Sequence, residues 1–206
     1  MNPKVPQLSR KEREKQQHRQ EIMDAAMRLF AEQGYHSVSM QEIAAEAEFA
    51  TGTLYKFFPS KRELFREIMV GVIEDIGVEL RSVFESDDEP LAVIGNFLQI
   101  RRAAFKKRYE YIKLYNMVGN GFGSSGDEVV DALIAERRKN VEQLLMRHFT
   151  RGIESGLFKP VNVEVLARLF EEFCQTIIRS EARRGELDDA AIDSIIDVFL
   201  NGILVQ

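Results

Sequence analysis

Apolar residues recur at intervals of three and four along almost the whole 206-residue chain. This spacing places apolar side chains on one face of a helix, whereas a strand would require alternation of apolar and polar residues. No segment alternates convincingly, and glycine, proline or short polar clusters separate the periodic segments. We therefore predict an all-α fold of about nine helices, with no sheet.

Three stretches have the sequence of a capping box, in which Ser and a Glu three residues later satisfy free N–H groups at a helix start. They are Ser9–Glu12, Ser39–Glu42 and Ser125–Glu128. Gly34 is suited to end the first helix, and Pro90 to open a later one. The expected helices cover about residues 9–33, 39–47, 51–57, 60–85, 90–108, 109–118, 125–155, 162–184 and 188–204.

The helices fall into a small N-terminal domain, residues 1–62, and a larger C-terminal one, residues 63–206, with the helix near 61–85 joining them. Charge differs along the chain: residues 1–66 hold 11 Lys/Arg and 9 Asp/Glu, whereas residues 67–206 hold 17 and 24. Within the first 20 residues, 6 are basic and 2 acidic. This asymmetry indicates a polyanion contact confined to the N-terminal end, with a merely solvated basic tail as the alternative.

Several classes of protein find no support in the sequence. The single cysteine, Cys174, excludes an internal disulfide and suits a reducing cytoplasm. Three histidines lie far apart, and no metal-binding spacing, nucleotide loop or nucleophile–base pair is apparent. No apolar run is long enough to cross a bilayer, and the polar N-terminus is not a secretory signal. We expect a cytoplasmic protein that is not an enzyme and has no metal or cofactor.

Residues 39–64, SMQEIAAEAEFATGTLYKFFPSKREL, contain two very short helices with a break at Glu48–Ala50. Two short helices joined by a turn of this length form a helix-turn-helix, whose second helix enters the DNA major groove. Short or polar side chains at the start of that helix, such as Thr51 and Thr53, allow close approach. A small helical hairpin, in which Thr53 and Tyr55 are capping and core residues, is the alternative.

The segment LFAEQGYHSVSMQEIAAEAEFATGTLYKFFPSKRELF, residues 29–65, resembles the N-terminal domain of the TetR (tetracycline repressor-like) family of transcriptional regulators. The family pattern has a helix ending near F-x-x-x-G-[YF], then T/S-[VM]-x-x-[IL]-A, a turn that is usually G-V-S, and x-G-[TS]-L-Y-x-[YH]-F-x-[SN]-K-x-x-L. The positions that match are Phe30, Gly34, Tyr35, Ser39, Ile43, Ala44, Gly52, Thr53, Leu54, Tyr55, Phe58, Ser60, Lys61 and Leu64.

The sequence departs from the family in the turn, where Glu48-Phe49-Ala50 replaces Gly-Val-Ser. Glu48 stands where a residue suited to positive φ is usual, at a cost of about 1 kcal/mol if that conformation is kept. Ala50 replaces the usual cap of the second helix, again a loss of about 1 kcal/mol. A shift of the cap by one residue to Thr51 would restore it. Phe57 stands where His or Tyr is usual.

The resemblance implies a DNA-facing surface that reads a palindromic operator in double-stranded DNA. We expect phosphate contacts from Ser39, Tyr55 and Lys61, and base contacts from Gln41, Thr51 and Lys56. The implied surface comprises Ser39, Gln41, Thr51, Gly52, Thr53, Tyr55, Lys56 and Lys61. A basic arm would add backbone or minor-groove contacts through Lys4, Arg10, Lys11, Arg13, Lys15 and Arg19.

The resemblance also implies a homodimer formed through the last two helices. Their apolar faces are wide enough to build a four-helix interface between two copies, or to close an intramolecular core. The two faces comprise Val165, Leu166, Leu169, Phe170, Phe173, Ile177 and Ile178, then Ile192, Ile195, Ile196, Phe199, Leu200, Ile203 and Leu204.

A third implication is a small-molecule effector bound in the C-terminal domain. Tyrosine hydroxyls on an apolar wall suit a mostly apolar ligand with one or two polar groups, although ordinary core aromatics give the same pattern. The residues assigned to this site are Phe97, Ile100, Tyr109, Tyr111, Tyr115, Phe122, Phe170 and Phe173. Residues 119–126 are either a gate or a plain connector. A regulator controlled by a protein partner, or without an effector, is the rival hypothesis.

Overall fold

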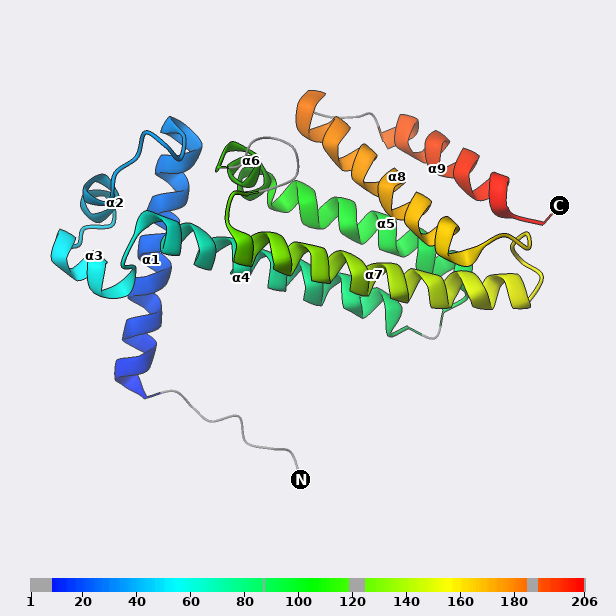
Figure 1. Cartoon of the computed structure of the whole chain (residues 1–206), viewed down its shortest axis with the longest axis horizontal. Coiled ribbons are helices and arrows are strands. Elements are labelled where there is room, and N and C mark those ends of the chain that lie inside the picture. The colour runs from blue at the N-terminus through cyan, green and yellow to red at the C-terminus, as the bar shows by residue number, and fades with distance from the viewer. Residues whose placement is uncertain (1–8, 87, 119–124, 185–188, 206) are drawn as a thin grey trace. The chain divides into compact units, whose positions relative to one another are not determined.

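The computed structural model describes residues 9–86, 88–118, 125–184 and 189–205. Over these residues Figure 1 shows helices throughout, in the order α1 (Arg10–Gln33), α2 (Met40–Glu46), α3 (Thr51–Phe57), α4 (Lys61–Phe84), α5 (Pro90–Lys107), α6 (Tyr109–Val118), α7 (Glu128–Glu154), α8 (Val163–Arg184) and α9 (Asp189–Ile203). The described residues contain no strand, only an isolated antiparallel bridge between Phe158 and Leu204. The prediction of an all-α fold is confirmed.

Local capping signals located two helix starts correctly and one incorrectly. Ser9 and Ser39 each form the expected capping box, with Glu12 and Glu42 respectively. The cap of α7 is Asp127 rather than Ser125, because Asp127 Oδ1 accepts hydrogen bonds from the N–H groups of Val129 and Val130. Asp127 immediately precedes the first helical residue, which is the position a capping carboxylate requires.

Contacts divide the chain into two compact units. Unit 1 contains α1 to α3, α4 through Gly71, and residues 110–130; unit 2 contains the remainder of α4, α5, and the chain from Asp131 onward. The expected boundary after residue 62 follows the DNA-binding motif, whereas the contacts keep the first turns of α4 with unit 1. One reason is a pair of arginines on those turns, Arg62 and Arg66, which both bind Asp127.

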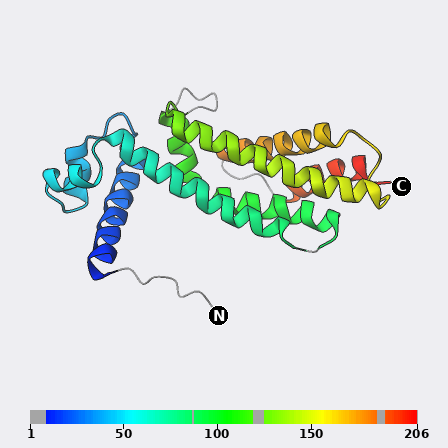
Figure 2. The same cartoon turned by 60° about the horizontal axis from the view of Figure 1, so that its bottom comes forward.

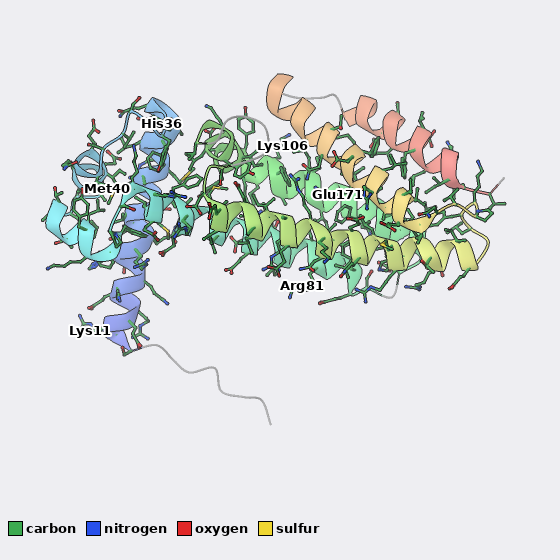
Figure 3. The ribbon with its side chains drawn as sticks, in the orientation of Figure 1. Lys11, His36, Met40, Arg81, Lys106 and Glu171 are labelled. Atoms are coloured by element: carbon green, nitrogen blue, oxygen red, sulfur yellow. The ribbon has the colours of Figure 1, made fainter. Side chains whose placement is uncertain are left out.

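Unit 1 is held together by an apolar core drawn from its first four helices. Every member is at most 6% exposed, and burial of a large apolar side chain contributes about 1.5–3 kcal/mol. Met40, labelled in Figure 3, also belongs to this core. The other members include Ile22, Ala25, Ala26, Phe30, Ile43, Ala44, Leu54, Phe58, Leu64, Phe65 and Ile68.

Unit 2 is built around a chain of packed phenylalanines. Ring centroids lie 5.2 Å apart for Phe84 and Phe97, 6.0 Å for Phe97 and Phe170, and 5.7 Å for Phe170 and Phe149. Figures 1 and 2 both show α7 running along the part of α4 that belongs to this unit. Among the described helices, none is long and apolar enough to span a bilayer.

Candidate nucleic-acid interface and effector region

The turn between α2 and α3 adopts the backbone that the family pattern requires, although its residues differ. Glu48 has φ of 60°, which is the left-handed conformation normally taken by glycine. The turn closes through hydrogen bonds from Glu48 N–H to the Ala45 carbonyl, at 3.1 Å, and from Phe49 N–H to the Ala44 carbonyl, at 2.8 Å. The strain expected at Glu48 is therefore present.

Helix α3 begins without a side-chain cap. Ala50 is the N-cap residue and makes no capping hydrogen bond, while Thr51 is already the first helical residue. The expected shift of the cap to Thr51 is therefore wrong: the turn geometry fixes the helix start at Ala50, as in the family pattern. Thr51 consequently keeps a hydroxyl that the helix start does not use.

An aromatic contact that the sequence did not reveal joins the turn to α1. The His18 ring lies 5.1 Å from the ring of Phe49 and 6.2 Å from that of Phe57, both edge to face. Phe49 and Phe57 are two of the departures from the family pattern, and each meets His18. The substitutions are thus accommodated together, which only the tertiary structure could indicate.

The outer face of α2 and α3 carries most of the residues assigned to DNA. Gln41, Gly52 and Lys56 are exposed, Thr51 and Thr53 are partly exposed, and Tyr55 is 43% exposed. On the opposite face of α3, Leu54 is fully buried. A Cβ atom added to Gly52 would meet no atom within 4 Å, and Gly52 does not have positive φ. Nothing within the described chain requires glycine at this position.

Two of the expected phosphate contacts have partners inside unit 1. The Ser39 hydroxyl is occupied by Glu42, both as the acceptor of its N–H and as a donor to its carboxylate at 2.6 Å. Lys61 Nζ donates to the carbonyls of Tyr35 and Val38, each at 2.7 Å, and lies 4.5 Å from the centre of the Tyr35 ring. Burial lowers the pKa of Lys61. Lys61 therefore fastens the loop between α1 and α2.

The basic arm is divided by the structure. Arg10, Lys11, Arg13 and Lys15 are exposed on the first turns of α1, and Figure 3 shows Lys11 near the free end of this helix. Arg19 instead packs inward: its Nε donates to Glu67 at 2.8 Å, and its guanidinium lies 4.5 Å from the centre of the Phe58 ring. Lys4 lies outside the described residues.

The residues assigned to an effector are divided between the two units. Phe97 and Phe170 are buried in the core of unit 2, and Phe173 stacks on Phe199 with ring centroids 5.2 Å apart. Ile100 and Tyr109 also belong to unit 2, with Tyr109 41% exposed, whereas Tyr111 and Tyr115 belong to unit 1. Phe122 lies outside the described residues, as do positions 119–124 of the expected gate.

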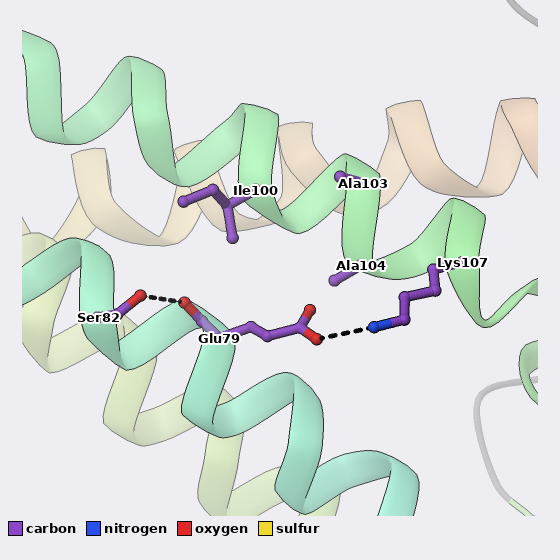
Figure 4. Close-up of a pocket in the computed structure, with 6 residues that line it drawn as sticks. All are labelled: Glu79, Ser82, Ile100, Ala103, Ala104 and Lys107. Carbon is purple, nitrogen blue, oxygen red and sulfur yellow. Dashed lines mark hydrogen bonds and ion pairs between the residues drawn. The ribbon is translucent and has the colours of Figure 1, made fainter.

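Ile100 lines a groove between α4 and α5, shown in Figure 4. Its volume is about 300 Å³, and Glu79, Ser82, Ala103, Ala104 and Lys107 form the rest of its wall. Lys107 Nζ lies 3.6 Å from Glu79 Oε1, so an ion pair stands at one end of an otherwise largely apolar surface. Arg108 pairs with the same carboxylate at 2.7 Å, which lowers the pKa of Glu79.

The expected dimer helices divide their apolar residues between the core and the surface. On α8, Leu166, Phe170, Ile177 and Ile178 are buried, whereas Val165 and Leu169 are 52% and 59% exposed. Val198 on α9 is 73% exposed. The side chains of Ile192 and Ile195 lie outside the described part of the chain. An exposed apolar strip therefore remains on α8 after the intramolecular core is complete.

Residues 22–68 match the model of a family described as bacterial regulatory proteins, tetR family. The chain is 23% identical over 187 residues to the transcriptional repressor KstR2 of Mycobacterium tuberculosis, a match that covers 90% of this chain and 92% of that protein. It is 40% identical over 86 residues to the regulator AcrR of Shigella flexneri, covering 41% of this chain and 40% of that one.

Solved structures share the fold. The structure of the ketosteroid transcriptional regulator KstR2 of Mycobacterium tuberculosis superposes with a TM-score of 0.70 at 23% identity, covering 91% of this chain and 95% of that one. The SmeT–triclosan complex also gives a TM-score of 0.70, at 17% identity, covering 92% and 93% of the two chains. The similarity extends over both units rather than only the DNA-binding segment.

Proposed function

We propose that this chain, whose residues 22–68 match the tetR family model, is a DNA-binding transcriptional regulator that acts as a homodimeric repressor released from its operator by a small, mostly apolar effector. The observation that carries the DNA-binding surface is the open outer face of α3, where Tyr55 and Lys56 are exposed and a Cβ added to Gly52 would meet no atom within 4 Å. This face leaves room for the phosphate backbone to approach closely.

On this surface Thr51, Gln41 and Lys56 read base edges, and Tyr55 contacts phosphate. The exposed arginines and lysines at the start of α1 add phosphate contacts. Ser39 and Lys61 act indirectly, because their polar atoms hold the start of α2 and the loop before it. Residues 1–62 form the DNA-binding domain, and residues 63–206 form the effector-binding and dimerisation domain. The protein acts in the cytoplasm.

Dimerisation would place two DNA-binding domains about one turn of DNA apart, so that together they recognise a palindromic operator. The exposed strip of Val165 and Leu169 on α8, together with Val198 on α9, supports this arrangement. Apolar side chains at spacing of four residues on a helix that is already packed on its other face are suited to a second helix.

The proposed effector class follows from the composition of unit 2 and from the names of similar proteins. The ketosteroid regulator KstR2 and the SmeT–triclosan complex are both named for mostly apolar molecules that carry oxygen. An effector would release DNA only by binding more tightly to a dimer in which the spacing of the DNA-binding domains no longer matches the operator.

Fluorescence anisotropy tests the DNA-binding function. Labelled DNA from immediately upstream of the gene is titrated with the protein across a salt series, with random DNA of equal length as the control. Tight binding to one palindromic segment, with one or two dimers bound, is expected. Equal and salt-sensitive binding to both DNAs would contradict sequence-specific recognition of this region.

A regulator controlled by a protein partner is the alternative. The burial of the assigned aromatic residues favours it, since Phe97 and Phe170 are 0% and 1% exposed and belong to the core of unit 2. Release of the DNA by a panel of small apolar molecules would exclude this alternative.

A further inference from the structure

A cluster of three rings joins α1 to both ends of α3. The His18 ring on α1 lies 5.1 Å from the ring of Phe49, which stands just before α3, and 6.2 Å from that of Phe57, the last residue of α3. The two phenylalanine rings lie 6.5 Å apart, and all three pairs meet edge to face. One side chain of α1 therefore contacts the chain at the start and at the end of the helix assigned to the major groove.

The start of α3 lacks two features that would hold it locally. Glu48 has φ of 60°, a conformation that glycine adopts at less cost, and Ala50 makes no capping hydrogen bond. With seven residues, α3 is also far shorter than the helices that persist on their own in water. The orientation of α3 therefore depends on tertiary contacts, and Phe49 provides one of them at this end.

The end of α3 has a second contact with the same turn of α1. Arg19 Nη1 donates to the Phe57 carbonyl at 3.2 Å, so a cation satisfies a carbonyl in the last turn of the helix. Arg19 is itself held by Glu67 of α4, to which its Nε donates at 2.8 Å. His18 differs from Arg19 because its ring also reaches Phe49, and so connects the two ends of α3.

The ring cluster lies at the surface of unit 1 rather than in its core. His18 is exposed, and Phe49 and Phe57 are partly exposed. Because solvent still covers part of these rings, their contacts add less to global stability than core packing does. They do restrict where α3 can lie on α1. A binding element that is already held in its bound orientation loses less conformational freedom when its partner arrives.

We infer that His18 is a positioning residue for DNA recognition: its ring holds α3 in the orientation that fits the major groove, in place of the Gly and Ser of the family turn. The inference rests on the DNA-binding function proposed above. Without this ring α3 would occupy several orientations, and only the fraction that fits the operator would bind it. Operator affinity would fall, whereas the electrostatic attraction to DNA of any sequence would remain.

The variant His18→Ala tests the inference. Fluorescence anisotropy of the full-length protein at one salt concentration measures dissociation constants for a palindromic DNA segment from upstream of the gene and for random DNA of equal length. We expect binding to the palindromic segment to weaken about tenfold, as the loss of two aromatic pairs provides, with binding to random DNA unchanged.

The matched control is Gln16→Ala. Gln16 is also an exposed residue of α1, but it lies two positions from His18 and therefore on a different face of the helix. This variant should keep both affinities of the natural protein. A loss equal to that of His18→Ala would show that the ring contacts are not the cause, and would overturn the inference.

The variant His18→Phe separates positioning from a direct contact with DNA. Phenylalanine keeps a ring beside Phe49 and Phe57 but has no N–H to donate to a phosphate. We expect affinity for the palindromic segment close to that of the natural protein. If His18→Phe binds as weakly as His18→Ala, then His18 acts through its ring nitrogens, and the positioning role is wrong.

Restoring the family turn tests whether His18 replaces it. The triple variant Glu48→Gly/Phe49→Val/Ala50→Ser has glycine at the position of positive φ and serine as the cap of α3. In this background His18→Ala should weaken binding less than about threefold, since the pair with Phe57 is the one that remains to be lost. A tenfold loss in both backgrounds would contradict the inference. Circular dichroism checks that each variant is folded.

The outcomes distinguish the inference from the function on which it rests. A natural protein that binds the palindromic segment and random DNA equally would count against the proposed function and, with it, the inference. A natural protein that prefers the palindromic segment, with His18→Ala equally selective, would overturn the inference and leave the function standing. A preference that His18→Ala loses and His18→Phe keeps would support both.

Discussion

Two helical glycines, one in each unit, stand in opposite surroundings. Gly152 on α7 packs so closely against Phe158 that an added Cβ would overlap the ring, whereas a Cβ on Gly52 of α3 would meet nothing within 4 Å. The fold of unit 2 therefore requires its glycine, and the fold of unit 1 does not. Gly71, Gly95 and Gly202 are equally open, so contacts within the chain do not distinguish Gly52; we propose that the phosphate backbone of DNA approaches the open space beside Gly52.

The largest expected effect is at Gly152. Gly152→Ala forces the Phe158 ring to move within a packed core and should destabilise the protein by about 1–3 kcal/mol or more. Gly95→Ala on α5 is the matched control, since its Cβ would meet no atom within 4 Å. It should stabilise the protein by about 0.5–1 kcal/mol. Urea unfolding measures both, and a neutral Gly152→Ala would show that the two glycines do not differ.

A substitution at Asp127 tests whether its ion pairs with Arg62 and Arg66 stabilise the first turns of α4 within unit 1. Burial alone would raise the pKa of Asp127, but hydrogen bonds from Arg66 and Arg62 and from the Val130 N–H hold it well below its usual range. A depressed pKa contributes stability above the unfolded value, about 3.9, and that contribution is lost as pH falls through the folded pKa.

Asp127→Asn should therefore destabilise the protein by about 1–3 kcal/mol at pH 7, with a smaller difference from the natural protein at pH 3. Urea midpoints at the two pH values give the comparison. Glu14→Gln, which alters an exposed pair, is the control and should change little. A difference that grows as the pH falls would contradict the role assigned to Asp127.

A substitution at Lys61 distinguishes a structural role in the loop between α1 and α2 from a direct contact with DNA phosphate. As a loop fastener, Lys61→Met should lower stability by about 1–2 kcal/mol, because the carbonyls of Tyr35 and Val38 lose a charged donor. It should leave the salt dependence of DNA binding unchanged. As a phosphate contact, the expectation from the sequence, the variant should reduce the salt slope by about one with little loss of stability. Lys56→Met on the exposed face of α3 is the control for a lost external charge.

The sequence was sufficient for the helices and the helix-turn-helix because their signals are local. Capping boxes at Ser9 and Ser39 and the break at Glu48 each lie within a few residues of the structure that they determine. The contacts of Lys61 lie 23 to 26 residues away, and Arg101 lies 70 residues from Glu171. No periodicity in one sequence indicates such partners, so the sequence did not predict the carbonyl contacts of Lys61 or the ion pair between Arg101 and Glu171.

The assignment of aromatic residues to a pocket likewise depends on contacts that one sequence does not indicate. Aromatic side chains suit a ligand wall and a protein core equally well, and composition does not separate the two. In unit 2 the phenylalanines fill the core, while the groove is lined by small residues such as Ala103 and Ala104. In the sequence, the small residues that line the groove were less noticeable than the aromatic residues that fill the core.

We propose that the open face of α3 meets DNA, and Gly52→Ala tests this most directly because stability and binding should change in opposite directions. Urea unfolding should show a gain of about 0.5–1 kcal/mol, since alanine favours the helix and has room. Anisotropy with operator DNA should show weaker binding, because the methyl group enters the space that the phosphate backbone needs. A variant that is more stable and binds the operator as tightly as the natural protein would contradict the claim.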